Sequence, residues 1–369
     1  MAKFTCPYCL QEYRKSEVLY ECPVCRTKTR KSWLQSLFVR GAVKCSHIEN
    51  DVKCSGVAAI IKCPKCDNEL PKTALETPNL PFSIVGASSS GKTNYITVML
   101  HELASFPGLR LSLSHQDRAT LEHQNENYRK IYEEHIVPEA TPAGARMPQI
   151  WSIKNLQAQN KNSTPTYTFT IFDGAGEDHE NALDPSSTVC RYINSSKAIL
   201  ITLDPLILTN VRKWVSKDVR EHAGGGEAKN AVDIVNSLAN YIKAARGIRA
   251  DKKINTPAAI ILTKFDTLLQ HPNFAPNALI KQSCMTVRDG HVSDSEIQQI
   301  DEEIRRWLED VNERAFLDAI EANFTDFRYF GVSSYGKSPE AGGRTPQDIK
   351  PHRVLDPILW LFLKAGFIN

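Results

Sequence analysis

Short apolar runs alternate with longer amphipathic stretches from about residue 80 to the end of the chain. Each apolar run has the length of a buried strand, whereas the longer stretches repeat apolar residues with the helical period. After the first run, for example, Ile96, Met99, Leu100 and Leu103 share one helical face. The strands are expected at 82–85, 109–114, 151–156, 168–173, 198–203, 260–262 and 329–332, and the helices at 94–105, 118–136, 229–245 and 293–323.

Strands that alternate with helices predict an α/β fold, in which a mostly parallel sheet carries helices on both faces. Residues 151–156 are expected to form an edge strand. Two stretches are expected to be loops, because 138–148 contains three prolines and 222–226 ends in three glycines.

An eight-residue glycine- and serine-rich segment lies between the first strand and the first helix. Its sequence, Gly86-Ala87-Ser88-Ser89-Ser90-Gly91-Lys92-Thr93, has the G-x-x-x-x-G-K-T pattern of a phosphate-binding loop. Glycine lets backbone N–H groups point toward a phosphate, and the helix start adds a favourable dipole end. We expect Lys92 to contact the β and γ phosphates and Thr93 to bind Mg²⁺. The other residues expected to contact the nucleotide are Gly86, Ser88, Ser89, Ser90, Gly91 and Asn94.

Polar residues also follow two later strands. Asp173 ends an alternating strand, begins a D-x-x-G pattern and can hold Mg²⁺ through water, while the Gly176 N–H can bind the γ phosphate. Asp and Gly after a strand also form ordinary turns, so this pattern alone is weak.

A T-K-x-D pattern ends the strand at 260–262 and predicts a guanine site. The Asp266 carboxylate would accept two hydrogen bonds from guanine that adenine cannot donate, and the Lys264 stem would pack along the base. The pair Ser333-Ser334 ends the last strand and resembles the loop that contacts the guanine carbonyl.

The N-terminal part has a different chemistry, because eight of the ten cysteines lie before residue 67. Two C-x-x-C knuckles separated by twelve residues have zinc-ribbon spacing, and four thiolates complete a closed structural site. The first set is Cys6, Cys9, Cys22 and Cys25, and the second is Cys45, Cys54, Cys63 and Cys66. His47 is an alternative ligand, and Cys6-Pro7-Tyr8-Cys9 also matches a glutaredoxin-type redox motif, although no βαβ pattern surrounds it. Cys190 and Cys284 stand alone and are expected to be ordinary buried residues.

These features divide the chain into three parts. We expect a tandem zinc-ribbon region at 1–70, a proline-bearing linker at 71–81, and an α/β nucleotide-binding domain at 82–369. Residues 33–43 are expected to form a short amphipathic helix between the ribbons. Because a linker joins the parts, metal chelation is expected to spare nucleotide binding.

Charge and hydropathy change this picture little. Residues 1–80 hold 13 Lys and Arg against 8 Asp and Glu, a surplus of +5 that two four-thiolate zinc sites would reduce to about +1. A protein partner is therefore favoured over nucleic acid for the ribbons. No apolar run approaches the roughly 20 residues of a membrane span, and the start shows no signal peptide. We expect a soluble, cytoplasmic protein, in which disulfides are disfavoured.

The order of the three motifs over residues 82–334 resembles the translation-factor-related class of phosphate-loop GTPases. Within that class, the cysteine knuckles, the segment Leu203-Asp204-Pro205 and the ending 353–360 resemble the bacterial double-GTPase family of the second type. The resemblance implies GTP binding and hydrolysis with Mg²⁺. It also implies GTPase-activating-like protein partners or a second GTPase, in prokaryotic conflict systems.

The catalytic residues depart from that class. Related GTPases carry Gln or His after the D-x-x-G glycine, and this chain carries Glu177, which either orients the attacking water or is a solvent-facing switch residue. Thr141 is the candidate switch threonine. Arg146 is the one arginine considered as an intrinsic arginine finger, and the alternative is a solvated charge. Three functions stay open: a GTPase switch with slow, partner-regulated turnover, a nucleotide-bound scaffold with negligible turnover, and an ATPase.

Overall fold

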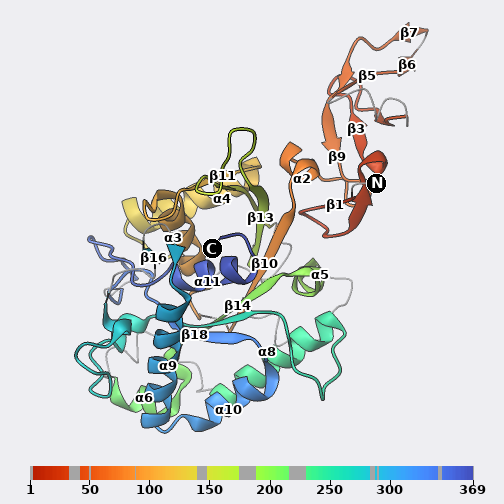
Figure 1. Ribbon diagram of the computed structural model, residues 1–369. Helices are drawn as coiled ribbons and strands as arrows, with labels where there is room; N and C mark the ends of the chain where they lie inside the picture. The colour runs from red at the N-terminus through yellow and green to blue at the C-terminus, as the bar shows by residue number, and fades with distance from the viewer. Residues whose placement is uncertain are drawn as a thin grey trace.

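The computed structural model describes residues 3–32, 42–49, 51–87, 89–138, 148–173, 188–215, 230–282, 287–288, 291–339 and 343–368. Within these ranges, a seven-stranded sheet is the centre of the molecule, in the order β11-β12-β13-β10-β14-β15-β18 (Figure 1). The five strands from β13 to β18 are parallel, whereas β11 and β12 are antiparallel to their neighbours. The strands are β10 (Asn79–Gly86), β11 (Leu111–His115), β12 (Gln149–Asn155), β13 (Thr166–Asp173), β14 (Ala198–Leu203), β15 (Ala258–Leu262) and β18 (Phe327–Gly331).

Alternating strand residues face two separate apolar cores. On β14, Ile199 and Ile201 face one core, while Ala198 and Leu200 face the other. The first core is covered by α5 (Thr188–Ser195), α8 (Ala231–Arg246), α9 (Asp294–Asp310) and α10 (Arg314–Asn323). The second is covered mainly by α3 (Lys92–Ser105) and α11 (Asp356–Lys364). The prediction of an α/β fold with a mostly parallel sheet and helices on both faces is therefore confirmed.

Helix boundaries follow local capping. The Asn230 side chain accepts a hydrogen bond from the Val232 N–H at 3.0 Å and starts α8, which ends at Gly247 with φ 65°. The stretch expected as one helix at 293–323 is two helices, because the chain turns at Asn312, where φ is 62°. The expected helix at 118–136 is α4 (Arg118–Tyr128) followed by a π-helical turn, η2 (Arg129–Glu133).

The edge-strand prediction is wrong. Strand β12 lies between β11 and β13, and its Ile150 and Ile153 are fully buried. Strand β11 forms the edge instead, and its five residues are all partly or fully exposed.

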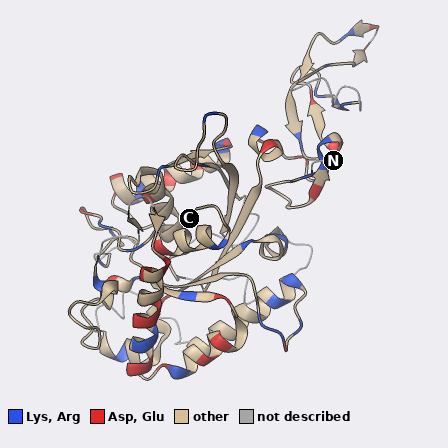
Figure 2. Ribbon diagram, in the orientation of Figure 1, with Lys and Arg blue, Asp and Glu red and all other residues tan. Residues whose placement is uncertain are grey.

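Short connecting elements complete the α/β part. They are η4 (Pro205–Ile207), α6 (Thr209–Trp214), η5 (Phe265–Thr267), η6 (Leu279–Lys281), β16 (Val287–Arg288) and β17 (His291–Val292). On the outer helices α9 and α10, acidic and basic side chains intersperse (Figure 2). Arg314, for example, pairs with Asp318 and Glu309 at 2.9 and 2.6 Å.

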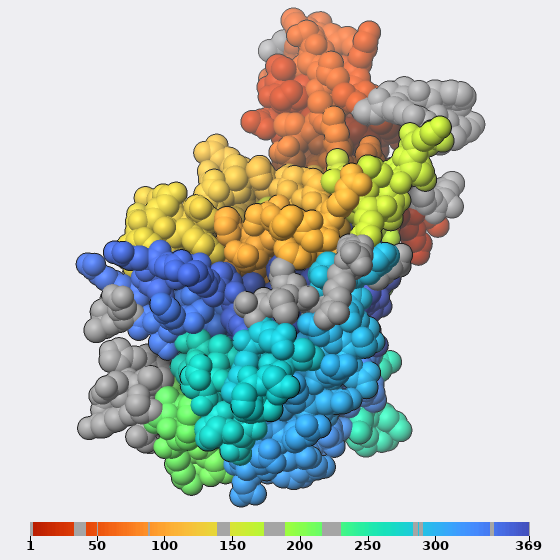
Figure 3. Space-filling model, turned by 60° about the vertical axis from the view of Figure 1, so that its left-hand side comes forward, coloured from red at the N-terminus to blue at the C-terminus, as the bar shows by residue number. Residues whose placement is uncertain are grey.

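The N-terminal residues form a lobe that protrudes from the rest of the molecule (Figure 3). Its elements are β1 (Lys3–Thr5), β2 (Glu12–Arg14), η1 (Lys15–Glu17), β3 (Leu19–Glu21), β4 (Lys28–Arg30), β5 (Val43–Lys44), β6 (Ile48–Glu49), β7 (Val52–Lys53), β8 (Val57–Ala58) and β9 (Ile60–Lys62). Strand β3 lies between β4 and β9 in a three-stranded sheet. The other strands form two-stranded sheets, in which β1 pairs with β2, β5 with β8, and β6 with β7. Most of the amphipathic helix expected at 33–43 lies outside the described residues.

The segment expected as a linker, 71–81, contains regular structure. Helix α2 (Lys72–Glu76) occupies part of it, and β10 begins within it at Asn79. The Thr77 and Thr168 hydroxyls hydrogen-bond at 2.9 Å, so the segment is attached to β13. The domain boundaries themselves stay a prediction. Among the described residues, no helix has the length and hydrophobicity that a membrane span requires.

A buried ion pair fixes the start of α11. The Arg353 and Asp356 side chains are 1% and 2% exposed and lie 2.7 Å apart, and Arg353 also donates to the Leu279 carbonyl at 2.6 Å. Both charges lie in the interior, and the buried Glu296 carboxylate also lies 3.8 Å from the Arg353 guanidinium, so Arg353 compensates buried negative charge.

We predict that Arg353→Ala lowers the free energy of unfolding by about 3 kcal/mol and Tm by about 6 °C, because the Asp356 carboxylate loses the buried cation that compensates its charge. Calorimetry of the full chain measures the change. Lys350→Ala removes an exposed pair with Asp348 and serves as the control that leaves Tm unchanged. Equal melting of the two variants would contradict the assignment.

Candidate nucleotide site and cysteine clusters

The phosphate-loop segment begins where the central strand β10 ends. Gly86 pairs with Thr202 of β14, and a Cβ atom at Gly86 would lie 2.3 Å from the Thr202 hydroxyl oxygen. No side chain fits there, so glycine is required at this crossing of two backbones. Ser89 and Gly91 both have positive φ, 61° and 76°, and they turn the chain into α3.

Hydrogen bonds from neighbouring strands hold the loop. The Ser90 hydroxyl lies 2.9 Å from the Thr202 hydroxyl, and both side chains are buried. The Thr263 hydroxyl, from the T-K-x-D motif, donates to the Ser90 carbonyl at 2.9 Å. The loop and the T-K-x-D motif therefore form one connected unit.

Lys92 lies inside this loop and is 8% exposed. Its ammonium donates to the carbonyl oxygens of Gly86 and Ala87 at 2.9 and 3.0 Å. Thr93 and Asn94 follow in the first turn of α3 and are half-buried. The positive charge is thus held at the point where loop and helix N-terminus meet, which is the arrangement that binds phosphate.

The D-x-x-G motif is described only in part. Strand β13 ends at Asp173, whose backbone pairs with Ile84 of β10. Asp173 and the phosphate loop therefore both lie at the C-terminal ends of the parallel strands. The expected site residues Ser88, Thr141, Gly176 and Glu177, and Arg146 with them, lie outside the described residues, as does the Asp173 side chain.

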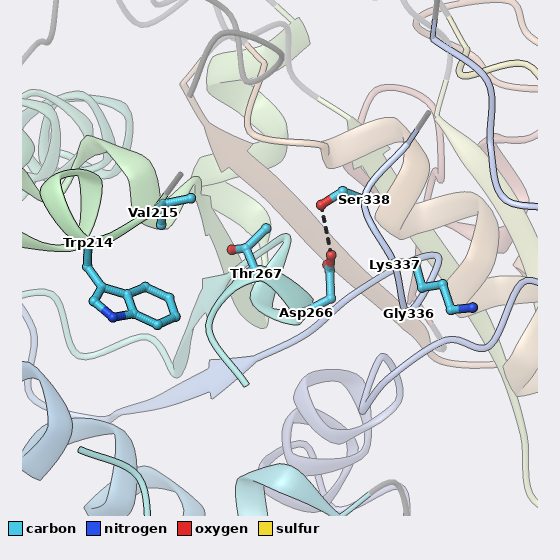
Figure 4. A pocket seen from close by; sticks show the side chains of 7 residues that line it. All are labelled: Trp214, Val215, Asp266, Thr267, Gly336, Lys337 and Ser338. Carbon is cyan, nitrogen blue, oxygen red and sulfur yellow. Dashed lines mark hydrogen bonds between the residues drawn. The ribbon is translucent and has the colours of Figure 1, made fainter. Parts of the chain in front are cut away.

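Two serines hold the Asp266 carboxylate at the end of β15. One oxygen accepts from the Ser333 hydroxyl at 2.6 Å. The other accepts from the Ser338 hydroxyl at 3.1 Å (Figure 4). Ser334 follows Ser333 and is half-buried. The Lys264 ammonium lies 2.6 Å from an Asp204 carboxylate oxygen, and the same Asp204 side chain caps η4 through the Leu206 N–H. The structure therefore brings Asp266 and Ser333 together and fixes Lys264 beside them.

An open cavity of about 500 Å³ begins at Asp266 (Figure 4). Trp214, which is 41% exposed, forms its far wall. Its lining consists of Trp214, Val215, Asp266, Thr267, Gly336, Lys337 and Ser338.

Several residues of this site were not anticipated from the sequence. Thr202 carried a usable signal, because a hydroxyl within the apolar strand 198–203 needs a hydrogen-bond partner. The segment Leu203-Asp204-Pro205 does not by itself indicate that Asp204 pairs with Lys264. Ser338 and Trp214 carry no sequence signal, since each reaches the site through loop geometry.

Eight cysteines form two four-sulfur clusters, but not in the predicted sets. The clusters are Cys6, Cys9, Cys63 and Cys66, and Cys22, Cys25, Cys45 and Cys54. In each cluster the sulfurs lie within 4.8 Å of one another. Nearest sulfurs lie 3.5 to 3.9 Å apart, close to the roughly 3.8 Å edge of a tetrahedron with 2.3 Å zinc–sulfur bonds. Both clusters therefore fit zinc, and His47 belongs to neither among the described residues.

The predicted grouping is wrong because of strand direction. β3 and β9 are antiparallel, with Tyr20 opposite Ile61, and each strand leads directly into a knuckle. Cys22 and Cys63 therefore lie at opposite ends of the same small sheet, and each cluster takes cysteines from distant parts of the sequence.

The three C-x-x-C knuckles share one backbone turn. The residue after the second cysteine has positive φ, and its N–H donates to the carbonyl of the first cysteine. These residues are Leu10, Arg26 and Asp67. A hydrogen bond from Cys6 lowers the pKa of the Cys63 thiol to about 6, and hydrogen bonds from Thr27 lower the pKa of Cys25 to about 6. The Cys6 thiol, in the same cluster as Cys63, shifts in the opposite direction, because hydrogen bonds with Cys63 and Cys66 raise its pKa. Cys190 is buried as expected, and Cys284 lies outside the described residues.

A family model described as Double-GTPase 2 matches residues 81–341 of this chain. A protein of Mycolicibacterium smegmatis, described as "Putative ESX-1 scaffolding and assembly protein SaeC", is 25% identical over 330 residues, which cover 84% of this chain and 80% of that protein.

Solved structures give a weaker likeness. The Saccharomyces cerevisiae Ski7 GTPase-like domain, bound to GDP and inorganic phosphate, is 12% identical with a TM-score of 0.33 and covers 79% of this chain. The Trypanosoma brucei Arl6 BBS3 small GTPase is also 12% identical, with a TM-score of 0.31, over 79% of this chain and 99% of that one. The aligned part spans about half of the Ski7 chain. Such scores do not by themselves define the fold.

We predict that the chain binds two zinc ions and that paired substitutions reveal the interleaved sets. Cys6→Ser with Cys66→Ser removes two ligands of one cluster and should lower the zinc content from two to one per chain. Cys6→Ser with Cys25→Ser damages both clusters and should lower it toward zero. Elemental analysis of the purified full chain reports the content, and the opposite order of losses would support the sequence-based sets.

Proposed function

Because the chain belongs to the Double-GTPase 2 family, we propose that it is a GTP-binding switch that hydrolyses GTP slowly and is regulated by a protein partner. The observation that carries the proposal is the connection between the two halves of the site. Thr263 precedes the residues that would bind the base, and its hydroxyl donates to Ser90 in the phosphate loop. A purine nucleotide, which joins a base to a phosphate chain, would engage both halves.

The phosphate half would use the loop and the first turn of α3. We assign Lys92 to the β and γ phosphates, with backbone N–H groups of Ser89, Ser90 and Gly91 around them. The hydroxyl of Thr93 and the carboxylate of Asp173 would hold Mg²⁺, which supplies charge neutralisation at the phosphates. Gly86, Ser88 and Asn94 complete the proposed contacts.

The base half would use the loops after β15 and β18. Asp266 would accept hydrogen bonds from guanine, and the Ser333 hydroxyl orients its carboxylate. The Ser334 backbone N–H would meet the guanine carbonyl. The ion pair with Asp204 fixes the Lys264 stem, which would lie along the base.

Hydrolysis would depend on residues outside the described part of the chain. We assign Gly176 to the γ phosphate, Thr141 to the switch, and Glu177 to the attacking water or to the switch. No arginine finger follows from the sequence, and Arg146 is the candidate to test. An activating protein in trans, or a second GTPase, would then set the rate.

A second candidate function is a nucleotide-bound scaffold with negligible turnover. The Mycolicibacterium smegmatis relative supports it, because its name describes scaffolding and assembly. A role in a prokaryotic conflict system rests on the family resemblance alone. An ATPase is the weakest alternative. The Asp266 carboxylate, which Ser333 and Ser338 hold in place, would face adenine, which lacks the two N–H donors of guanine.

We favour a protein partner for the N-terminal lobe over nucleic acid. Its basic side chains are partly neutralised, since Lys28 pairs with Asp67 at 2.5 Å and Arg26 with Glu21 at 2.9 Å, and both signs intersperse on the lobe (Figure 2). The experiment that tests the proposal most directly denatures the purified protein and identifies the released nucleotide. GDP or GTP is the expected product, and ATP or ADP would support the alternative.

Lys92→Ala should weaken GTP binding at least about 100-fold while the fold persists, because the variant loses the cation held in the phosphate loop. Titration calorimetry measures the affinity, and circular dichroism confirms the fold. Lys197→Ala changes an exposed lysine directly before β14, at the N-terminal ends of the parallel strands and away from the phosphate loop. This variant should bind GTP normally. Unchanged affinity in Lys92→Ala would refute the phosphate-loop assignment.

Asp266→Asn should weaken GTP about 100-fold and favour xanthosine triphosphate, because the amide donates to the second carbonyl of xanthine where the carboxylate accepted from guanine. Competition against a fluorescent guanine nucleotide reports both affinities. Asp251→Asn, at an exposed ion pair, is the control. A variant that keeps its preference for GTP would place the base elsewhere.

The isolated chain should turn over GTP at well below about 1 s⁻¹, because Glu177 replaces the usual water-positioning residue and no arginine is assured in cis. Phosphate release under saturating GTP and Mg²⁺ measures the rate. A fast rate that disappears in Glu177→Ala would show instead that Glu177 is a catalytic residue.

A further inference from the structure

The first zinc knuckle packs directly against the α/β part of the molecule. The Tyr192 hydroxyl, on α5, donates a hydrogen bond to the Pro7 carbonyl, and Pro7 lies between the ligands Cys6 and Cys9. The Tyr192 side chain is fully buried although the knuckle belongs to the other lobe. The contact is therefore part of the interior rather than a touch between two surfaces.

The same tyrosine also contacts the strand that carries the D-x-x-G motif. Its ring stacks on Phe172 of β13, with centroids 4.4 Å apart and planes 10° apart. Leu10, from the knuckle, packs with both rings in one small cluster. Exposed fractions of 7%, 2% and 0% for Leu10, Phe172 and Tyr192 show that water is excluded.

Phe172 and Tyr192 are close in sequence to residues that are proposed to bind Mg²⁺ and the γ phosphate. Phe172 directly precedes Asp173, and Tyr192 belongs to the helix that follows the D-x-x-G segment. A second connection runs to the phosphate-loop strand: the Ser196 hydroxyl donates to the Tyr192 carbonyl at 2.7 Å and lies 2.6 Å from the Ser83 hydroxyl of β10. Tyr192 therefore contacts β13 directly and is connected to β10 through Ser196.

The position of Pro7 and Leu10 depends on the knuckle. Leu10 has a φ of 54°, and its N–H donates to the Cys6 carbonyl at 2.9 Å. Zinc holds such a turn by drawing the thiolates together, and small zinc modules lose their structure without the metal.

We propose that the first cysteine cluster and Tyr192 form a positioning unit for the nucleotide site, so that zinc binding at this cluster and nucleotide binding are thermodynamically coupled. The inference rests on the proposed GTP-binding function. Coupling of this kind is reciprocal: if zinc strengthens nucleotide binding, then nucleotide must strengthen zinc binding by the same factor. This differs from the sequence-based expectation that chelation spares nucleotide binding.

The chain supplies an internal control. Cys45 and Cys54 of the second cluster follow β5 and β7, which lie at the far end of the N-terminal lobe (Figure 1). Only the first cluster contributes the knuckle that meets Tyr192 among the described contacts. Nucleotide should therefore change the release of one zinc ion and leave the other unchanged.

The experiment loads the full chain with two zinc ions and follows their transfer to the chromophore 4-(2-pyridylazo)resorcinol. We expect a non-hydrolysable GTP analogue with Mg²⁺ to slow one of the two release phases by about 5-fold or more. A Cys45→Ser/Cys54→Ser variant, which keeps the first cluster intact, should retain the responding phase. Equal rates with and without analogue, in protein that binds it by titration calorimetry, would overturn the inference.

Two variants separate positioning from simple docking. Tyr192→Phe keeps the ring on Phe172 and removes the donor to Pro7, and it should reduce the effect of nucleotide on zinc release to less than about 2-fold. Tyr8→Phe is the matched control, because its hydroxyl donates from the same knuckle to Asp117 at 2.7 Å, and it should keep the full effect.

A merely structural role gives a different result, in which both variants release zinc faster and keep the wild-type ratio; that result would refute the proposal. Failure of the proposed function is distinguishable, because the wild-type chain would then bind no guanine nucleotide in the calorimeter at all.

Discussion

Parallel pairing of β10 with both β13 and β14 is the constraint on which the rest of the structure depends. Parallel strands release their following loops at the same edge, so the phosphate loop, Asp173 and Asp204 emerge together. Gly86 permits the close approach to Thr202 that this pairing requires. The helices pack on both faces of this sheet through the two apolar cores.

The candidate site is a set of polar contacts built on that edge. The Ser90 hydroxyl hydrogen-bonds to the Thr202 hydroxyl, the Thr263 hydroxyl donates to the Ser90 carbonyl, and all three residues are buried. These buried hydrogen bonds fix the loop geometry, because a shift of the loop would leave a buried polar group unpaired. Base recognition and phosphate recognition therefore share a single support.

Much of the fold and part of the site could be predicted from the sequence. The apolar run at 198–203 predicted the strand that the structure shows as β14, and the motifs identified Lys92, Asp266 and Ser333, which the structure describes. Local signals sufficed there because each motif directly follows a strand. The Lys264 contact with Asp204 could not be predicted, since it depends on how two loops meet.

Long-range pairing was beyond the reach of sequence spacing. The cysteine residues were identified correctly, but their grouping depends on the antiparallel register of β3 and β9, which no C-x-x-C pattern encodes. The same limit explains the edge strand, because burial of β12 is decided by its neighbour β11. The segment 71–81 has linker composition, yet Thr77 attaches it to β13.

In the N-terminal lobe, one cysteine cluster is nested within the other along the chain. The inner cluster, Cys22, Cys25, Cys45 and Cys54, lies between the two knuckles of the outer cluster, Cys6 and Cys9 with Cys63 and Cys66. Cys25 and Cys45 of the inner cluster are 20 residues apart, whereas Cys9 and Cys63 of the outer cluster are 54 apart and enclose it. Closing a shorter loop costs less chain entropy, and the last inner ligand, Cys54, precedes Cys63 in the chain. During synthesis the inner cluster can therefore close before the outer one has all its ligands. Tyr192 emerges later still, so the cysteine ligands of both clusters precede in synthesis the helix on which the lobe docks.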